Sequence, residues 1–147
     1  MLVENSRRII IHDAAYTSAQ TCPLERNSRH KFARFYLDVR GASGTGGLTL
    51  SVRGYSFNGV LVGGSSQVTG GVPMNGEAMG NPGAILTAPA AITATGVYIY
   101  ELGQYPQAAS GAVQLTVARD LPIYWDVQVA HADGSTYTYS VSVELVS

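Results

Sequence analysis

The chain has 147 residues and a mass of 15.5 kDa, a size that suits one domain with a sizeable hydrophobic core. Hydrophobic residues make up 46% of the sequence and charged residues only 13%, so the composition argues against an intrinsically disordered chain. Nine basic and ten acidic side chains give a formal net charge of −1, which argues against a nonspecific nucleic-acid binder.

The distribution of apolar and charged residues narrows the class further. The longest apolar runs, such as residues 9–11, are far shorter than the roughly 20 residues that cross a bilayer, so we expect no membrane span. Residues 1–8 contain Arg but no apolar segment follows them, so we expect no signal peptide. The single cysteine, Cys22, excludes an internal disulfide. Residues 1–40 hold seven basic and four acidic side chains, whereas residues 41–147 hold two basic and six acidic ones. This asymmetry reflects either chance or charge complementarity between copies or with a partner.

Hydrophobic side chains alternate with a period of two, and no window carries the stripe of an amphipathic helix. Residues 14–22 suit an edge strand, and residues 31–40 and 48–55 predict two half-buried strands. The Gly-rich turn GASGTGG between the last two strands predicts that they pair as antiparallel neighbours. The side chains expected on their inner faces are Ala33, Phe35, Leu37, Val39, Leu48, Leu50 and Val52. Those expected to point the other way include Arg34, Tyr36 and Asp38.

A Gly-rich segment follows and breaks the regular spacing of the strands. Residues 54–83 contain nine glycines in thirty residues. This segment is far longer than the connections of about 4–6 residues that are usual in a compact domain. We expect residues 56–83 to form an extended hairpin or contact arm that is ordered by neighbouring molecules. The apolar side chains of this arm are Phe57, Val60, Leu61, Val62, Val68, Val72, Met74 and Met79.

The remaining strands are expected at residues 96–102, 113–117, 123–131 and 136–146. The first of these alternates without showing which face is buried. In the strand at 123–131, one face carries Ile123, Trp125, Val127 and Val129, while Asp126 is expected to face solvent. In the strand at 136–146, the side chains expected to point inward are Tyr137, Tyr139, Val141, Val143 and Leu145. Because Asp133-Gly134 supplies the positive φ angles of a tight turn, these two strands are predicted to form a C-terminal hairpin.

About eight short strands joined by Gly-rich turns predict a single all-β domain over residues 1–147. We expect a β-sandwich, jelly-roll-like or immunoglobulin-like, with an N-terminal segment 1–30, the Gly-rich arm, and under about a tenth of the residues in helix. The predicted core consists of Phe35, Leu37, Leu50, Val52, Trp125, Val127, Val141 and Val143.

No catalytic arrangement is visible in the sequence. His12, His30 and His131 have no metal-ligand spacing, although a zinc site assembled from all three in space stays open as a remote alternative. His131 is expected to make a structural hydrogen bond, and His12-Asp13 is expected to end the first strand. GASGTGG lacks the Lys-Ser/Thr ending and the helix of a phosphate loop. We therefore predict a protein that is not an enzyme and has no metal or cofactor.

Tyrosines occur as alternating pairs on the predicted strands, at Tyr98 and Tyr100 and at Tyr137 and Tyr139. Such tyrosines fill a core, meet a protein partner or form a platform for sugars, and all three readings stay open. The candidate contact residues of the chain are Phe57, Leu61, Val68, Val72, Met74, Met79, Tyr98 and Tyr100.

Three stretches, FYLDVRGASGTGGLTLSVRG, AAITATGVYIYELG and LPIYWDVQVAHADGSTYTYSVSVELV, resemble small virion structural proteins of tailed bacteriophages. The resemblance covers most of residues 30–147, while residues 59–83 depart from it by their length and glycine content. The matching positions are Leu37, Asp38, Val39, Ser43, Gly44, Thr45, Leu48, Thr49, Gly54, Thr95, Gly96, Leu121, Pro122, Trp125, His131, Asp133, Gly134, Tyr139, Ser140 and Val141.

The resemblance implies a β-sandwich that decorates or cements the outer surface of a phage head, with the major capsid protein or another virion protein as partner. A homotrimer is the expected assembly, because decoration proteins commonly occupy three-fold lattice positions. The sequence contains one Lys against eight Arg, and Arg is the basic residue that interfaces favour. A neck or tail protein of the virion and a carbohydrate-binding module are the alternatives.

Overall fold

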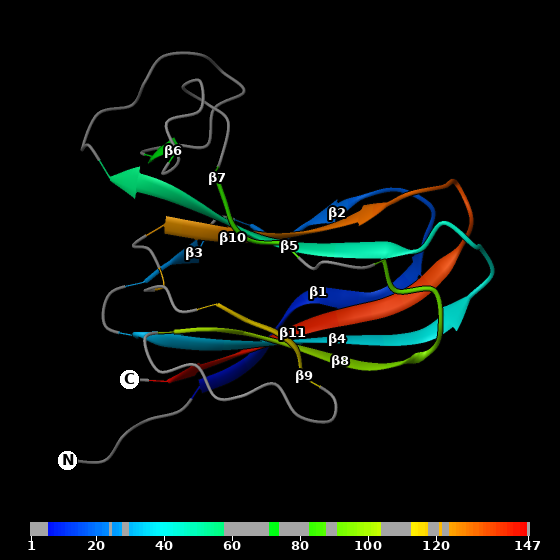
Figure 1. Cartoon of the computed structure of the whole chain (residues 1–147), viewed down its shortest axis with the longest axis horizontal. Helices are drawn as coiled ribbons and strands as arrows, with labels where there is room; N and C mark the ends of the chain where they lie inside the picture. Colours follow the sequence, from blue (N-terminus) through cyan, green and yellow to red (C-terminus); the bar gives the residue numbers. More distant parts are fainter. Residues whose placement is uncertain are drawn as a thin grey trace.

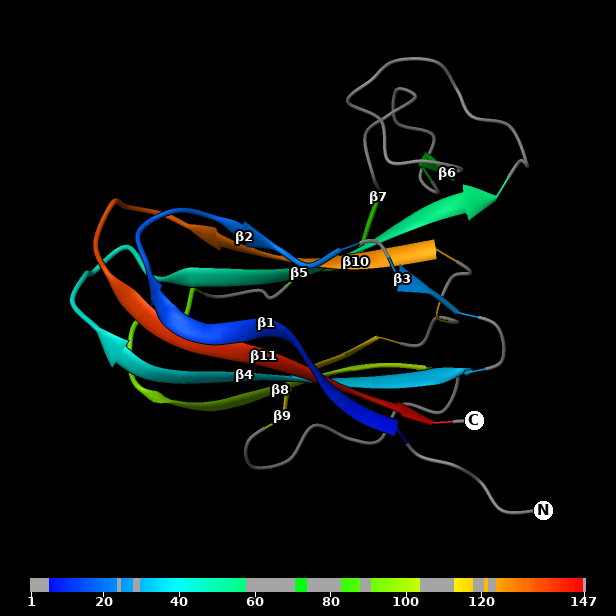
Figure 2. The ribbon, with the colours of Figure 1, turned by 180° about the vertical axis from the view of Figure 1, so that it is seen from behind.

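The computed structural model describes residues 6–23, 25–27, 30–57, 71–73, 83–87, 91–103, 113–117, 121 and 124–146. Every regular element within these residues is a β-strand, and the strands form two sheets stacked face to face (Figure 1, and from behind in Figure 2). The all-β sandwich predicted from the sequence is therefore confirmed. The described residues contain no helix that is long and apolar enough to cross a membrane.

The two sheets differ in composition and in strand order. The five-stranded sheet has the order β1 (Ser6–Tyr16), β11 (Tyr137–Val146), β4 (Phe32–Ala42), β8 (Gly96–Leu102) and β9 (Val113–Val117), with only the last pair parallel. The six-stranded sheet centres on β10 (Tyr124–His131) and β5 (Leu48–Phe57). Its short outer strands are β2 (Gln20–Thr21) and β3 (Glu25–Arg26) beside β10, and β6 (Gly71–Pro73) and β7 (Gly83–Thr87) beside β5.

The hydrophobic core lies between the sheets and follows the predicted alternation. All eight predicted core residues are buried, and so are the predicted inward residues of β4, β5 and β11. Trp125 of one sheet meets Phe35 of the other edge to face, with 5.7 Å between ring centroids. This geometry is favourable for aromatic pairs and joins the sheets at their centre.

Both predicted hairpins are wrong, because in each case the two strands belong to different sheets. In the first case, β4 pairs with β11 and β8, whereas β5 pairs with β10. In the second case, β10 pairs with β5, whereas β11 pairs with β1 and β4. The two turns are crossings from sheet to sheet. A half-buried strand turns its apolar face toward the opposite sheet in both arrangements, whether the next strand in the sequence pairs with it or belongs to that opposite sheet. Alternation and turn residues therefore do not distinguish the two arrangements.

The two crossings, residues 43–47 and 131–137, hold each other and form what we call the corner. The backbone N–H of Gly46 donates to Asp133 Oδ2 at 2.7 Å, and that of Gly47 donates to the hydroxyl of Tyr137 at 2.9 Å. The N–H of Ala132 donates to the carbonyl of Gly47 at 3.1 Å. Among the described residues positive φ occurs at Gly47 (84°) and Gly96 (152°) and not at Asp133 or Gly134, so the expected tight-turn geometry is absent.

Two further predictions about single residues need correction. Asp126 was expected in solvent, but it is only 3% exposed and accepts two hydrogen bonds from Arg53, at 2.7 and 2.6 Å. A buried carboxylate requires such a partner, and a bidentate guanidinium supplies it. His12-Asp13 does not end the first strand, since β1 continues to Tyr16 with register shifts between Ile9 and Ala14. Residues 14–22 are not one edge strand as predicted, because β1 ends at Tyr16 and β2 covers only Gln20–Thr21 in the other sheet, although both strands lie at sheet edges.

The Gly-rich arm is described only in part. β6 and β7 both pair antiparallel with β5, and Val72 of β6 lies opposite Ser56 in the register. The side chains of Phe57 and Val72 lie outside the description, as do the whole residues Leu61, Val68, Met74 and Met79. Their predicted role in contacts stays a prediction.

Candidate interaction surface

Of the predicted contact residues, only Tyr98 and Tyr100 have described side chains. Tyr100 is fully buried, which corrects its assignment to an interface, and burial raises the pKa of its phenol to about 12. Tyr98 packs partly against the core and donates its hydroxyl to the carbonyl of Ala94 at 2.9 Å. Tyr137 and Tyr139 are also fully buried. Of the three interpretations of these tyrosines, the one that places them in the core is therefore correct for Tyr100, Tyr137 and Tyr139.

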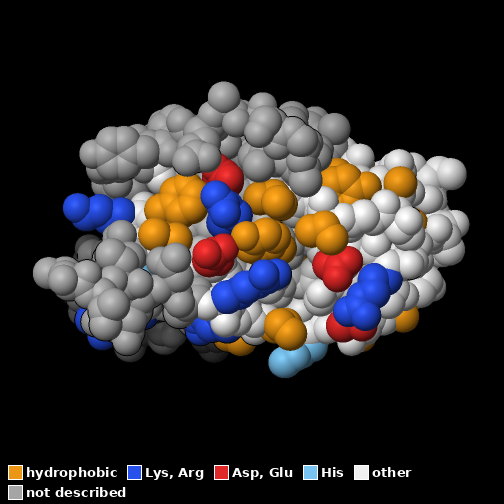
Figure 3. Space-filling model, turned by 90° about the horizontal axis from the view of Figure 1, so that it is seen from below, with side chains coloured by type: hydrophobic (Ala, Val, Ile, Leu, Met, Phe, Trp, Pro, Cys, Tyr) orange, Lys and Arg blue, Asp and Glu red, His pale blue; other side chains and the backbone are white. Residues whose placement is uncertain are grey.

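A different surface gathers the exposed apolar groups: the outward side of β1, β11, β4 and β8, which we call the outer face. Ile9 and Val97 are 58% and 50% exposed and are the exposed large hydrophobics of the described residues. Ile9 lies on β1 and Val97 on β8, on opposite sides of the two central strands. Figure 3 views this side and shows apolar and charged side chains interspersed over it.

Strand register arranges the outer face in rows that run across the sheet. One row consists of Arg7, Glu144, Arg34 and Glu101, in which basic and acidic side chains alternate. The next row consists of Ile9, Ser142, Tyr36 and Ile99. The third contains Ser140, Asp38 and Val97. Side chains directly opposite each other in adjacent strands are close enough to interact, so each row is a continuous strip.

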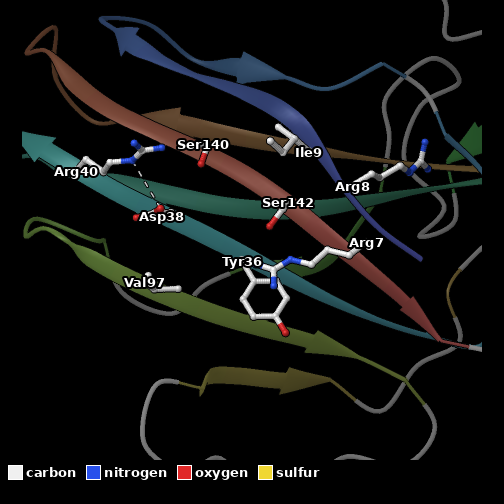
Figure 4. A pocket seen from close by; sticks show the side chains of 9 residues that line it. All are labelled: Arg7, Arg8, Ile9, Tyr36, Asp38, Arg40, Val97, Ser140 and Ser142. Carbon is white, nitrogen blue, oxygen red and sulfur yellow. Dashed lines mark ion pairs between the residues drawn. The ribbon is translucent and has the colours of Figure 1, made fainter. Parts of the chain in front are cut away.

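A hollow of about 380 Å³ lies where the second and third rows cross β11. The side chains of β11 here are two serines, Ser140 and Ser142, while the neighbouring strands carry Ile9, Tyr36 and Arg40 (Figure 4). Small residues on a central strand between larger ones therefore produce the depression. Arg8 also lines its rim, but its guanidinium turns to the other sheet and pairs with Glu25 at 2.6 Å.

The larger side chains around the hollow are held by contacts within the chain. The guanidinium of Arg7 lies 4.4 Å from the centroid of the Tyr36 ring (Figure 4). The Tyr36 hydroxyl donates to Glu144 Oε2 at 2.9 Å. Arg40 pairs with Asp13 at 3.2 Å and with Asp38 at 3.7 Å. Side chains fixed in this way lose less conformational entropy when a partner covers them.

Arg34 is the central cation of the alternating row. Its Nε donates to Glu101 Oε1 at 3.1 Å, and 32% of its side chain stays exposed. A hydrogen bond with Tyr36 and the charge of Glu101 raise its pKa, so it is a permanent positive charge on the outer face. Glu101 is only 2% exposed, and its second oxygen has no hydrogen-bond partner.

His131 belongs to the corner, where its Nε2 lies 3.0 Å from the Tyr139 hydroxyl and its ring meets Tyr137 edge to face. Desolvation lowers the pKa of His131, and the backbone N–H groups of Gly46 and Ser135 lower that of Asp133. The predicted structural hydrogen bond of His131 is confirmed.

The other histidines do not join it in a metal site. His12 is exposed, and its carbonyl accepts the hydroxyl of Tyr16 at 2.7 Å. The carbonyl of His30 accepts a hydrogen bond from Asn27 at 2.6 Å. Within the described part of the chain, no group of three His, Cys, Asp or Glu residues is placed to hold a metal ion.

The alternation in the sequence predicts that Arg34, Tyr36 and Asp38 point outward, but it does not indicate a site at these residues. The signal that would have found it is the pairing of β4 with β11 and β8, which aligns these residues with Ser142, Glu144 and Val97. Comparison with known proteins adds no assignment: no family model, no curated protein and no solved structure matches this chain.

Proposed function

We propose that this protein is a structural component of a tailed-phage virion, a capsid decoration protein that acts through protein–protein contacts. The observation that carries the proposal is the outer face, where the two exposed large hydrophobics of the described residues flank a hollow whose polar rim is already ordered. Mixed apolar and polar surfaces with aromatic and arginine side chains are typical of protein interfaces. The motif resemblance in residues 30–147 supplies the phage context.

In this proposal the Gly-rich arm, residues 56–83, attaches the protein to the major capsid protein, and β5, β6 and β7 form the base of the arm. Its apolar side chains are too numerous for a free linker. Burying such a segment stabilises a complex by roughly 25 cal/mol for each Å² of apolar surface, less the entropy of ordering the glycines. A stabilised shell is the expected consequence, and three copies around a three-fold position are the expected arrangement from the lattice.

The test is localisation and binding. Purified protein is mixed with phage heads that lack it, the heads are sedimented, and the bound density is located in a particle reconstruction. Protein on the outer head surface supports the proposal, while protein at the neck or tail supports the other virion role. No binding to any part of the particle contradicts both.

A carbohydrate-binding module is the alternative from a different class, and the geometry of the outer face disfavours it. Among the described residues that line the hollow, Tyr36 is the one with an aromatic ring, and the Arg7 guanidinium already lies over that ring at 4.4 Å from its centroid, where a sugar would otherwise stack. A glycan-array signal that disappears in Tyr36→Ala would favour this alternative over the structural role.

A further inference from the structure

We propose that the outer face is a homodimer contact, in which two copies pack face to face about a two-fold axis that runs parallel to the strands between β11 and β4. This inference deepens the protein-contact role proposed above by naming the partner as a second copy of the chain. Under this two-fold operation the rows of the outer face are complementary to themselves.

The two-fold axis sets which strands meet. It places β4 of one copy over β11 of the other, and β1 of one copy over β8 of the other, while each row stays over its own counterpart. Such a contact is isologous, so every contact occurs twice. Stacked sheets lie about 10 Å apart, and a large side chain must therefore meet a small one for the space between them to be filled.

The row through the hollow meets this size requirement. Tyr36 of one copy lies over Ser142 of the other, and the bulky ring thus enters the depression that the serines create. Ile9 on β1 comes to lie over β8 of the second copy, the strand that carries Val97 and Ile99. The exposed apolar groups, which have no apolar neighbour across the sheet in the single chain, cover each other in the pair.

The charges match under the same operation. Arg34 on β4 lies opposite Glu144 on β11 of the second copy, and both have side chains long enough to meet across the sheet spacing. Asp38 lies opposite Ser140, a short acceptor facing a short donor, a pair that a bridging water completes. Had Arg34 and Glu144 carried the same charge, the two-fold would oppose like charges. The alternation of sign across β11 and β4 therefore makes the face complementary to itself.

The outer face thus supplies a two-fold contact between copies, separate from the arm that the proposed function assigns to the capsid. The three-fold arrangement expected from the lattice alone is not needed for this contact. Because packed twisted sheets cross at about 30°, the outer strands β1 and β8 shift farther from their counterparts in the second copy than the central strands β4 and β11 do. The contact of Tyr36 with Ser142 beside the axis is therefore the one that a test should target.

The test exchanges the large and the small side chain that meet at the two-fold axis. The mass of each variant in solution is measured by light scattering during size-exclusion chromatography. The wild-type protein is expected at twice the chain mass of 15.5 kDa. Ser142→Tyr fills the hollow with a ring that collides with Tyr36 of the second copy, and it is expected to run at the chain mass. Thr49→Tyr introduces the same ring on β5 of the other sheet, at another half-buried, outward position, and is expected to keep the doubled mass.

The double variant Tyr36→Ser/Ser142→Tyr restores a large-to-small pair with the partners exchanged, and it is expected to regain the doubled mass. Far-UV circular dichroism and thermal melting show that each variant folds. A wild-type chain that stays at the chain mass at all concentrations overturns the inference, as does a Ser142→Tyr variant that remains double or a higher oligomer that Ser142→Tyr leaves intact. This assay uses no phage particle, so its outcome is independent of whether the protein binds heads.

Discussion

Gly47 and Gly134 lie in the two crossings of the corner, and they distinguish the observed fold from the hairpins that the sequence suggests. If β10 and β11 formed a tight hairpin, Gly134 would need the positive φ. In the structure it does not, and a Cβ built on it meets nothing within 4 Å. Gly47 instead has φ +84°, and its Cβ would lie 2.9 Å from the carbonyl oxygen of Ile92 and 3.0 Å from Ala91 Cβ.

We therefore expect opposite results for the two alanine variants. Gly47→Ala costs about 1–2 kcal/mol for the left-handed backbone and about 1–2 kcal/mol more for the contacts that must shift, in total about 2–4 kcal/mol of unfolding free energy. Gly134→Ala leaves stability unchanged or raises it by up to about 1 kcal/mol, because alanine has fewer unfolded conformations.

Urea unfolding followed by the fluorescence of Trp125, the single tryptophan, measures both free energies in the same buffer. Each kcal/mol should also move the melting temperature by about 2–4 °C in a chain of this size. The reasoning is refuted if Gly134→Ala destabilises as much as Gly47→Ala, because the Asp-Gly pair would then form the hairpin turn. It is equally refuted if Gly47→Ala is neutral.

Because desolvation holds the pKa of His131 below 6.5 in the folded state, the unfolded chain binds more protons there as pH falls. Urea midpoints should accordingly be highest above pH 6.5 and fall from there through the folded pKa, and His131→Asn should flatten this slope; an unchanged slope would contradict the assignment. Asp126→Ala removes the bidentate partner of the Arg53 guanidinium, a side chain that is only 20% exposed. It should lower the free energy of unfolding in urea by up to about 3 kcal/mol, more than Asp38→Ala on the exposed side of β4 does. Deleting residues 65–80 should leave a soluble β domain with an unchanged far-UV spectrum that no longer sediments with heads; undiminished head binding by this variant would show that the arm is not the attachment.

The strands and their buried faces were predictable from the sequence because the two-residue period of a strand is a local property. Phe35, Leu37, Leu50 and Val52 alternate with polar residues over a few positions, and one side of a strand buried in a sandwich requires no more than that. The same holds for Trp125 and for the inward side of β11. Local alternation therefore fixed the fold class and most of the core before any pairing was known.

Which strands pair was decided by the tertiary structure. The turns after β4 and β10 have the composition of hairpins, but the corner makes them crossings through hydrogen bonds between residues about ninety positions apart, such as Gly47 to Tyr137. The burial of Asp126 is another such case, since its partner Arg53 lies on a different strand. No local pattern carries these contacts.

The candidate surface depends on pairing even more strongly. Tyr36, Ser142 and Ile9 come from three strands that are not consecutive in the sequence. They form one row only because β4, β11 and β1 are neighbours in the sheet. The sequence alone determined which side chains of β4 point outward, Tyr36 among them, but not which side chains of β1 and β8 do so. The strand order determined which of them stand together, because a surface is made of side chains from adjacent strands rather than from adjacent residues.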